Sequence, residues 1–475
     1  MARNRSTIED FHGKRAVVMG LGTRQGGVGV ARFLAARGAA VTVTDLRDAT
    51  VLEPAIAALA GLPIRFVLGE HRPEDFDQAD IVVRNPGVPA DSPWIARARQ
   101  AGAQIEMEMS LFFRACPAPI IAVTGTKGKT TTATMCATIL RAQRSDTVLA
   151  GNMGRSALDL LEWIGPDTPV VLELSSWQIE GIAEHRLSPH VAVWTNLHPD
   201  HLNRYPSMDA YAEAKRGLVR YQSRDDWFVA NRDDPIVWES RTATQAATMP
   251  FGMDDGVSDG AFLDDDRLIW RRSGDAISIC NRADLPLPGP HAAMNALAAA
   301  AATLLYGADI DVVRAGLRAV EPIAHRQERV AEIDGVTYVN DTAATTPAAV
   351  LAALDTFHGR PLVVIAGGAE KGVPLAELAQ RLAREAAGVV LLDGTATPEL
   401  QHLLTEAGAS VVRGPFDSMR RAVEEASALA PAGGVVLLSP GCASFGLFRD
   451  EFHRGQAFRD AVEQISERRA GAQTR

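Results

Sequence analysis

The sequence predicts an α/β protein of three domains, each built on a parallel sheet. The 475 residues exceed what one hydrophobic core usually holds, and at about 150 residues per domain they predict three domains. Short apolar runs of strand length alternate with helical runs along the chain, which is typical of parallel sheets joined by crossover helices. Two of the strand-to-helix turns are rich in glycine, as in proteins that bind nucleotides.

Composition, charge and cysteine spacing exclude several classes of protein. With 47% hydrophobic and 22% charged residues the chain is of the globular type, and no apolar run approaches the roughly 20 residues of a membrane span. Residues 1–15 lack the apolar core of a signal peptide, so we expect a cytoplasmic protein with no membrane partner. A net charge of −10 argues against binding nucleic acid. No metal-ligand spacing links the cysteines, so we expect reduced, buried thiols at Cys116, Cys136, Cys280 and Cys442.

The first predicted unit is a βαβ motif with a glycine-rich turn. Strand, turn, helix and second strand are expected over residues 14–19, 20–27, 28–37 and 40–44. Asp45 follows Gly22 by 23 residues, close to where a dinucleotide-binding fold places its ribose ligand. The glycine spacing is looser than in the nicotinamide fingerprint. A redox cofactor, another nucleotide-like ligand and a purely structural turn therefore all stay open.

A second turn in this unit also lies where ligands bind. The apolar run 79–83 predicts a strand that leads into Asn85-Pro86-Gly87. Ligands of open α/β sheets sit at the carboxyl ends of strands, so this turn is a candidate part of the same site. Two prolines within residues 114–119 then predict a linker to the next unit.

The stretch over residues 120–132 reads IIAVTGTKGKTTT and predicts a strand, a phosphate-binding loop and the start of a helix. Backbone N–H groups of the loop and the positive end of the helix would face phosphate oxygens. Lys129 would add a positive charge, and Thr130 a hydroxyl ligand for Mg²⁺. Two residues separate the glycines where the common loop has four, so the pattern is met in a shortened form. The predicted loop comprises Gly125, Thr126, Lys127, Gly128, Lys129, Thr130 and Thr131.

Three further polar positions follow predicted strands of the same unit. Glu173 lies near the end of an apolar strand, where a carboxylate is costly unless it is paired or bound to a metal. The run 192–197 predicts a strand that carries His201 to the same sheet edge, and a helix over 208–221 contains Lys215. Each residue alone has an ordinary alternative, a satisfied polar residue at a strand end or, for Lys215, a solvated helix lysine. Their joint placement beside a phosphate loop favours a site.

The last third of the chain again alternates strands and helices. Strand-like runs at residues 361–368, 388–393 and 434–439 predict another parallel sheet.

Taken together, these motifs resemble the Mur ligases of peptidoglycan synthesis, over essentially the whole chain. The matching motifs, in order, are TGTKGKTTT, GNMG from Gly151, ELSSWQ from Glu173, DHLNRYP from Asp200, the Lys215 helix, the segment from Gly289-Pro290-His291 to Asn295, His325-Arg326, Asn340-Asp341 and LSPGCASF from Leu438. The resemblance implies a Rossmann-like UDP-substrate domain over residues 1–114, a central P-loop ATPase domain with a parallel sheet over 115–322, and a Rossmann-like domain for the amino acid over 323–475. It also favours UDP over NAD at the first glycine turn.

The resemblance implies an ADP-forming ligase that uses ATP to join D-glutamate to UDP-N-acetylmuramoyl-L-alanine through an acyl phosphate. It further implies two Mg²⁺ ions, a carbamylated lysine and a monomer. Carbamylation would turn Lys215 from a cation, which Mg²⁺ repels, into an anion. The implied catalytic residues are Lys129, His201 and Lys215, and the implied metal ligands are Thr130, Glu173, His201 and Lys215. Imidazole is not a preferred ligand of Mg²⁺, so the role of His201 as a metal ligand rests on the family more than on ligand chemistry.

The remaining roles implied by the resemblance concern the three substrates. For the nucleotide they fall on Asn295, Arg326 and Asp341. For the UDP-linked substrate they fall on Gly22, Asp45 and Asn152. For glutamate they fall on Thr345, Lys371, Ser444 and Phe445.

Three residues depart from the family pattern. Ala292 stands for an adenine-side asparagine, Ala343 for a lysine, and Glu451 for a phenylalanine that Phe452 would replace by a one-residue shift. A lost cation and a gained carboxylate near the glutamate site leave L-glutamate open as an alternative substrate, as in a variant branch that works with an epimerase. A nucleotide switch or kinase, a dehydrogenase and a folylpolyglutamate ligase are the alternatives from other classes.

Overall fold

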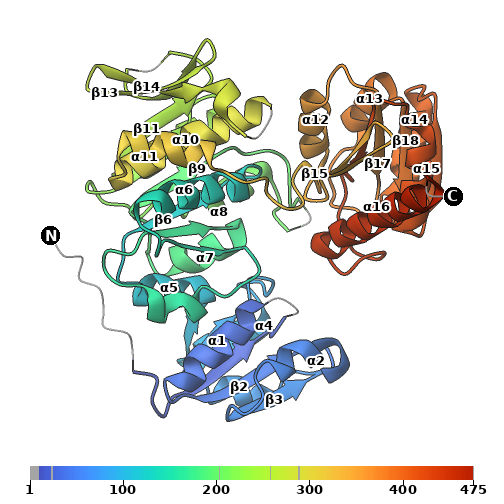
Figure 1. The fold of residues 1–475 in the computed structure, drawn as a ribbon. Coiled ribbons are helices and arrows are strands. Elements are labelled where there is room, and N and C mark those ends of the chain that lie inside the picture. Colours follow the sequence, from blue (N-terminus) through green and yellow to red (C-terminus); the bar gives the residue numbers. More distant parts are fainter. Residues whose placement is uncertain (1–9, 23–24, 203, 257, 287–288, 474–475) are drawn as a thin grey trace. The chain divides into compact units, whose positions relative to one another are not determined.

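The computed structural model describes residues 10–22, 25–202, 204–256, 258–286 and 289–473 (Figure 1). Two compact units result: Met1–Leu197 with Ala212–Asp284 and Ala293–Val320, and His198–Tyr211 with Leu285–Ala292 and Glu321–Arg475. Each of three sheets lies within one of the three predicted domains, whose exact boundaries stay a prediction. Residues 1–9, on which the signal-peptide argument partly depends, lie outside the described residues, as do Thr23 and Arg24 of the first glycine turn.

The first sheet is parallel and has the strand order β3-β2-β1-β4-β5. The order reverses at β1, so the turns after β1 and β4 lie at the carboxyl edge where a Rossmann-like fold binds its ligand. The elements are β1 (Arg15–Met19), α1 (Gln25–Ala36), β2 (Ala40–Asp45), α2 (Ala49–Ala57), β3 (Ile64–Leu68), α3 (Pro73–Asp77), β4 (Ile81–Arg84), α4 (Pro93–Gln100), β5 (Gln104–Glu106) and α5 (Glu108–Ala115).

The second sheet has nine strands in the order β14-β13-β12-β11-β10-β9-β6-β8-β7. From β11 to β7 the neighbours are parallel, and β6 lies between β8 and β9. Each residue of β6, β8 and β9 is buried, which explains their continuous apolar sequences.

The elements of this region are β6 (Ile120–Thr124), α6 (Lys129–Gln143), β7 (Val148–Gly151), η1 (Leu158–Trp163), β8 (Val170–Glu173), α7 (Ser176–Glu184), β9 (Val191–Trp194), α8 (Met208–Arg216), β10 (Trp227–Asn231), α9 (Pro235–Glu239), η2 (Ser240–Ala243), β11 (Ala247–Gly252), β12 (Gly260–Asp264), β13 (Arg267–Arg272), β14 (Asp275–Asn281), η3 (Arg282–Asp284), α10 (Pro290–Tyr306) and α11 (Ile310–Arg318).

Two predictions for this region need correction. The sheet is not parallel throughout, because β12, β13 and β14 form an antiparallel edge that the sequence analysis did not anticipate. The helix that carries Lys215 ends at Arg216 instead of residue 221. Beyond it the chain makes tighter turns, in which Leu218 N–H donates to Lys215 O at 3.0 Å, and Gly217 at the helix end is a poor helix former.

The third sheet has the strand order β15-β16-β20-β17-β18-β19, parallel except for the β15–β16 pair. Alternate residues of β17 face two separate cores. Val364 lies in the core with Leu378 of α13, and Val363 lies in the core with Val423 of α15. Helices therefore cover both faces, as in a doubly wound fold. The elements are β15 (Glu328–Ile333), β16 (Val336–Asn340), α12 (Pro347–Thr356), β17 (Leu362–Ala366), α13 (Ala376–Glu385), β18 (Gly388–Leu392), α14 (Thr397–Glu406), β19 (Val412–Phe416), α15 (Met419–Leu429), β20 (Val435–Leu438) and α16 (Glu451–Gln473).

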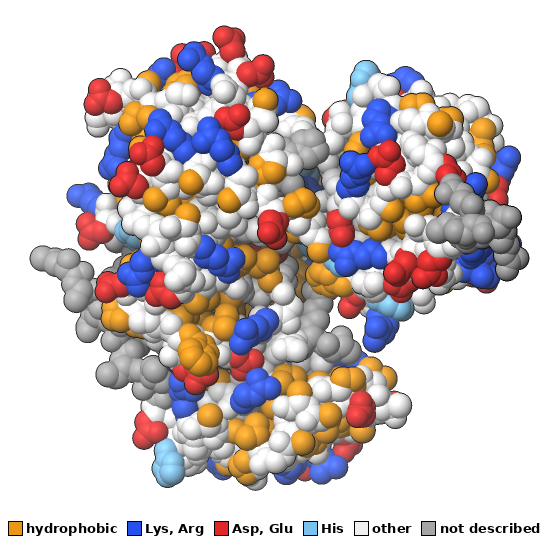
Figure 2. Space-filling view, viewed as in Figure 1, with side chains coloured by type: hydrophobic (Ala, Val, Ile, Leu, Met, Phe, Trp, Pro, Cys, Tyr) orange, Lys and Arg blue, Asp and Glu red, His pale blue; other side chains and the backbone are white. Residues whose placement is uncertain are grey.

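The charged surface and the state of the cysteines agree with the expectations drawn from composition. Basic and acidic side chains are interspersed over the face in Figure 2. Within the part of the chain that the structure describes, no helix is long and apolar enough to cross a bilayer. All four cysteines are free and buried, as predicted.

Candidate active site

The loop between β6 and α6 has the conformation that a phosphate site requires. Gly128, at the N-cap of α6, has a φ of 81°, a left-handed value that glycine adopts without strain. A side chain there would collide with the amide of Asn295. Two residues after β9 hold the loop: Lys127 N–H donates to Asn196 Oδ1 at 2.8 Å, and Thr195 Oγ1 donates to Lys127 O at 2.5 Å. These bonds use the N–H of Lys127 and fix the loop, which leaves the N–H groups at the start of α6 for an anion.

A carboxylate lies directly in front of this loop. Glu173 ends β8 beside β6 and is 3% exposed. Its Oε2 accepts from the Thr130 hydroxyl at 2.6 Å, and its Oε1 accepts from the Asn152 amide at 3.1 Å. Both donors are neutral, so the negative charge of Glu173 stays uncompensated by them. A hydroxyl, a carboxylate and nearby phosphate oxygens are ligands that Mg²⁺ prefers, and the residues therefore fit that ion.

The two lysines of the predicted site differ in their surroundings. Lys129 Nζ donates to Thr126 O at 3.0 Å, within the loop. Lys215 is 1% exposed and donates to Gly125 O at 3.0 Å and to Thr124 Oγ1 at 3.3 Å. The ordinary alternative for Lys215, a solvated helix lysine, is wrong. On the nucleotide side, Asn295 Oδ1 accepts from the Thr132 hydroxyl at 3.2 Å, next to the same loop.

The second compact unit brings together the residues expected to meet glutamate. Lys371 Nζ forms an ion pair with Asp200 Oδ1 at 2.9 Å and lies 3.4 Å from Thr345 Oγ1. Ser444 is buried and follows Ala443, which pairs with Ala369 two residues before Lys371. Phe445 is 63% exposed. This unit also contains His201, with a φ of 56° and Nε2 at 3.8 Å from Asp200 Oδ2.

The other predicted residues of this unit lie around the loop after β16. Asp341 accepts from Gln327 N–H at 3.2 Å and from the Ser439 hydroxyl at 2.9 Å. Arg326 follows His325, and burial lowers the pKa of that imidazole. Phe452, which is half exposed, packs edge-on against the His325 ring with centroids 5.6 Å apart.

Among the departures from the family pattern, Ala343 donates its N–H to His325 O at 3.1 Å. The Glu451 backbone carbonyl accepts from the Thr342 hydroxyl at 3.0 Å. Ala292 is buried.

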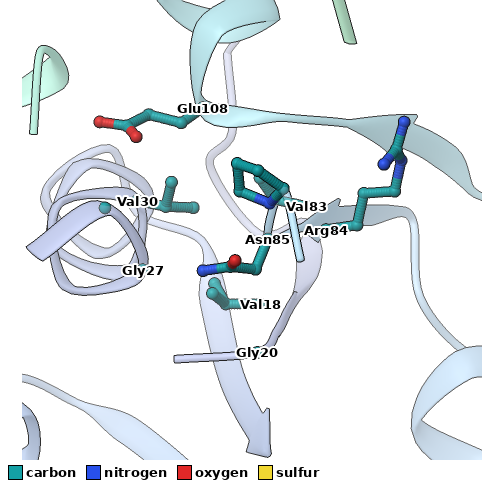
Figure 3. Close-up of a pocket in the computed structure, with 10 residues that line it drawn as sticks. Val18, Gly20, Gly27, Val30, Val83, Arg84, Asn85 and Glu108 are labelled. Atoms are coloured by element: carbon teal, nitrogen blue, oxygen red, sulfur yellow. The ribbon is translucent and has the colours of Figure 1, made fainter. Parts of the chain in front are cut away.

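At the first glycine turn, Gly22 N–H donates to Asp45 Oδ2 at 3.1 Å, so the structure joins the two residues predicted there. Arg47 binds both oxygens of the same carboxylate, at 3.0 and 2.9 Å. Burial raises the pKa of Asp45, but hydrogen bonds from Arg47 and Gly22 outweigh burial and leave that pKa below its usual value. A small pocket lies between this turn and the turn after β4, and its lining residues include Gly20, Gly27, Val30, Asn85 and Glu108 (Figure 3).

Sequence reasoning assigned no role to four residues of these sites: Arg47, Thr195, Asn196 and Asp200. Arg47, Thr195 and Asn196 stand within two residues of a strand end, a position that the sequence analysis used for other residues. The partner of Lys371 had no local signal, since Asp200 is far from it in sequence.

Three family models match successive parts of the chain. They are described as Mur ligase MurD-like, N-terminal domain (residues 14–106), Mur ligase middle domain (123–303) and Mur ligase, glutamate ligase domain (325–442). A UDP-N-acetylmuramoylalanine–D-glutamate ligase of Roseiflexus sp. (strain RS-1) is 51% identical over 465 residues, which cover 96% of this chain and 99% of that protein. The chain belongs to the Mur ligase family.

Other relatives agree with this assignment. A ligase of the same name from Symbiobacterium thermophilum is 40% identical and covers 95% of this chain and 98% of its own. The crystal structure of the UDP-N-acetylmuramate-alanine ligase MurC from Thermotoga maritima has a TM-score of 0.63 at 22% identity, covering 96% of this chain and 99% of that chain. The pseudomurein peptide ligase type C from Methanothermus fervidus has a TM-score of 0.61 at 20% identity, with coverages of 95% and 100%. Both structures share the three-domain fold.

As a Mur ligase, the chain is an ATP-dependent enzyme, and the ligases of this family use ATP and Mg²⁺. Residues 14–106 match a MurD-like N-terminal domain. This match argues against the folylpolyglutamate ligase and dehydrogenase alternatives, because neither class of enzyme has this domain. A nucleotide switch would not require the glutamate ligase domain that matches residues 325–442.

Proposed function

We propose that the chain joins D-glutamate to UDP-N-acetylmuramoyl-L-alanine, with conversion of ATP to ADP and phosphate, in cytoplasmic peptidoglycan precursor synthesis. The proposal rests on one observation above all, the Thr130–Glu173–Asn152 cluster in front of the phosphate loop. The near full-length relatives named for this reaction support the choice of substrates. We further propose three domains over residues 1–114, 115–322 and 323–475, acting as a monomer.

In the proposed reaction, a carboxylate oxygen of the UDP-linked substrate attacks the γ-phosphorus of ATP, and the bond to the ADP oxygen breaks. The amine of glutamate then attacks the acyl carbon and releases inorganic phosphate and a proton. Phosphoryl transfer of this kind depends mainly on positioning and on neutralising charge. Lys129 and the loop N–H groups would hold the phosphates. Mg²⁺, held by Thr130 and Glu173, would supply further positive charge.

A second Mg²⁺ and a carbamate on Lys215 are part of the proposal. Lys215 is buried beside the start of the loop, where an ammonium near two Mg²⁺ ions would be repelled. A carbamate there would be an anion, and His201 would be a further ligand. A ¹³C-NMR carbamate signal after incubation with labelled bicarbonate, lost in Lys215→Arg, supports this; its absence in the active enzyme contradicts it.

The proposed substrate contacts divide between the domains. Gly22 and Asp45 would meet the UDP group, Asn152 the muramoyl part, and Asn295, Arg326 and Asp341 the adenine nucleotide. Thr345, Lys371, Ser444 and Phe445 would meet glutamate. Lys371 lies beside the Thr345 hydroxyl but is paired with Asp200, so a glutamate carboxylate would take the place of Asp200 at this ammonium.

L-Glutamate is the second candidate, because Ala343 stands where D-glutamate ligases of the family have a lysine. The deciding experiment measures ADP release from ATP with UDP-N-acetylmuramoyl-L-alanine and each glutamate enantiomer. We expect turnover with the D form. Turnover with only the L form would establish the alternative, and ATP hydrolysis that needs neither substrate would contradict ligation.

A further inference from the structure

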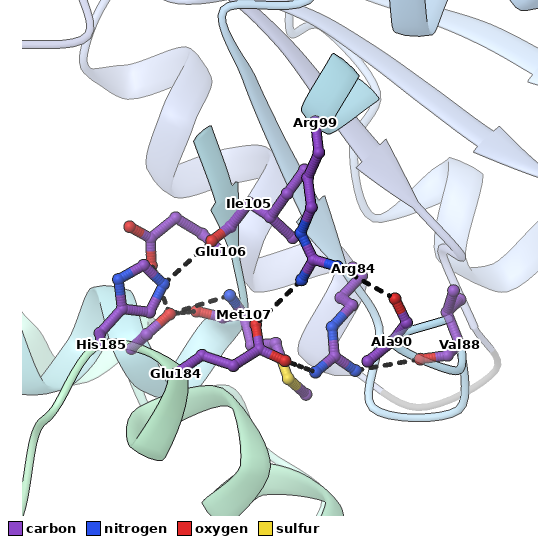
Figure 4. A network of polar contacts seen from close by, with 10 residues as sticks. Arg84, Val88, Ala90, Arg99, Ile105, Glu106, Met107, Glu184 and His185 are labelled. Carbon is purple, nitrogen blue, oxygen red and sulfur yellow. Dashed lines mark hydrogen bonds and ion pairs between the residues drawn. The ribbon is translucent and has the colours of Figure 1, made fainter. Parts of the chain in front are cut away.

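The end of helix α7 is joined to the turn after β4, residues 85–91, by a buried arginine. Arg84, the last residue of β4, has a side chain that is 0% exposed. Its Nη2 donates to Glu184 Oε1 at 2.8 Å, and its Nη1 donates to Val88 O at 3.0 Å (Figure 4). One guanidinium thus binds both the turn after β4 and the last residue of α7.

Glu184 also anchors the same turn a second time. Its other oxygen, Oε2, lies 3.6 Å from Arg99, which is 48% exposed and donates to Ala90 O at 3.3 Å. Next to it, His185 Nε2 contacts Ile105 O at 2.9 Å, at the end of β5 (Figure 4). The last residue of α7 and its C-cap therefore contact both the arginine that ends β4 and the backbone of β5.

Helix α7 starts at the catalytic edge of the second sheet. It begins at Ser176, with Ser175 as N-cap, directly after the β8 strand that ends at Glu173. Its other end is joined through Arg84 to the turn after β4, whose Asn85 lines the pocket beside the first glycine turn. One nine-residue helix thus connects the strand end that carries Glu173 with the arginine that holds the turn after β4.

Stability alone does not explain a buried arginine at this position. Burying an ion pair costs desolvation that an apolar side chain would avoid, and such pairs are often replaceable without loss of stability. Arg84 Nε is moreover buried without a hydrogen-bond partner, which is a further cost. A guanidinium, unlike other side chains, can bind the Glu184 carboxylate and the Val88 carbonyl at once and in fixed directions.

We propose that Arg84 is a positioning residue for the UDP-linked substrate. It fixes the turn at residues 85–91 through Val88 O and, through Glu184, sets that turn relative to α7 and the ATP site. The inference rests on the proposed function, because it assumes that this turn contacts the UDP-linked substrate.

The test compares Arg84→Met, Arg84→Lys and Glu184→Gln with the matched control Arg99→Gln in the full chain. We expect Arg84→Met to raise the KM for UDP-N-acetylmuramoyl-L-alanine about tenfold, the effect of losing charge-assisted hydrogen bonds, while kcat and the KM for ATP change less than about twofold. The lysine of Arg84→Lys can reach only one acceptor, so the KM of this variant for the UDP-linked substrate should lie between those of the parent and Arg84→Met. Arg99→Gln should change this KM by less than about twofold, because the ion pair of Arg99 is exposed and long.

A second measurement separates this inference from the proposed function. Hydrogen exchange of the amides in residues 85–91 should be faster in Arg84→Met than in Arg99→Gln, which loses only the exposed contacts of Arg99 with Ala90 O and Glu184, whatever reaction the enzyme performs. Parent enzyme without UDP-substrate-dependent ADP release would contradict the proposed function alone. Unchanged exchange in Arg84→Met and Arg84→Lys, or a uniform loss of kcat and melting temperature with the substrate KM unmoved, would overturn the role of Arg84.

Discussion

The two glycine turns of this chain have the same local plan and opposite electrostatics. Each follows an inner strand with a parallel neighbour on both sides, precedes a helix and lies beside a strand-end carboxylate. At the phosphate loop, Glu173 accepts from neutral donors, the Thr130 hydroxyl and the Asn152 amide. At the first turn, the Asp45 carboxylate is bound on both oxygens by the Arg47 guanidinium.

The partner of the carboxylate therefore determines what each turn can do. A carboxylate with neutral partners keeps its charge for a cation, so the second turn can bind Mg²⁺ with ATP. A carboxylate already neutralised by a guanidinium has little attraction left for a metal ion and acts as a hydrogen-bond acceptor instead. The first turn is accordingly suited to an organic ligand such as a nucleotide base or ribose.

The largest expected effect follows from making the second carboxylate neutral. Glu173→Gln keeps the size of the side chain but removes the charge proposed to bind Mg²⁺. We expect kcat to fall about 10³-fold, as when a main electrostatic contribution to phosphoryl transfer is lost. ADP release measured across a Mg²⁺ titration checks this. A variant with full activity at the same Mg²⁺ concentration would show that Glu173 is not a ligand.

Giving the phosphate loop a carboxylate like that of the first turn should weaken ATP binding. Asn196→Asp still accepts from Lys127 N–H, but it loses the bond from Asn196 Nδ2 to Lys127 O at 3.1 Å and adds a negative charge. We expect the KM for ATP to rise about thirtyfold, through charge repulsion and the lost hydrogen bond. Asn196→Ala is the control, since it removes the bonds without adding charge and should have a smaller effect. Equal effects in both variants would mean that charge is unimportant at this position.

The first turn should respond differently to the equivalent change. Asp45→Asn leaves Arg47 without its carboxylate and weakens the acceptor for Gly22 N–H. We expect the KM for the UDP-linked substrate to rise about tenfold, with kcat and the KM for ATP nearly unchanged. Steady-state kinetics with each substrate varied in turn provide the measurement. A fall in kcat like that of Glu173→Gln would remove the distinction between the two turns.

The sequence could predict which residues of the two sites meet at the carboxyl ends of neighbouring parallel strands. Thr130, Glu173 and Asn152 meet because β6, β8 and β7 are parallel neighbours, and parallel strands bring their carboxyl ends to one edge. Gly22 and Asp45 meet for the same reason.

The sequence could not predict the contacts between side chains of segments that are far apart in the chain. The pairing of Lys371 with Asp200 joins residues 171 positions apart, and the burial of Lys215 depends on how α8 packs against the loop. The antiparallel strands β12 to β14 were missed since short strands without helices between them did not fit the expected alternation.

The smallest expected effect concerns a third carboxylate, Glu108, whose Oε1 accepts from the Ser156 hydroxyl at 2.5 Å and from Ala157 N–H at 3.1 Å. Burial raises its pKa above the ordinary 4.5, although these two donors oppose the shift. Because the pKa of Glu108 is raised in the folded protein, its neutral form makes a contribution to stability that is fully present below pH 4.5. This contribution is lost as the pH rises through the folded-state pKa. Unlike Asp45, Glu108 therefore destabilises the fold when it ionises.

Glu108→Gln can still accept from both donors but never ionises. We expect it to raise the free energy of unfolding by about 1 kcal/mol at pH 8 and to make no difference below the unfolded-state pKa of a glutamate. Ser156→Ala is the matched control, because it removes a donor to the charged form and should lower stability at pH 8 by a similar amount. Denaturant unfolding at several pH values distinguishes the cases. A Gln variant that matches the parent at low pH but is less stable at pH 8 would mean that the charged carboxylate, like that of Asp45, is fully compensated by its hydrogen bonds.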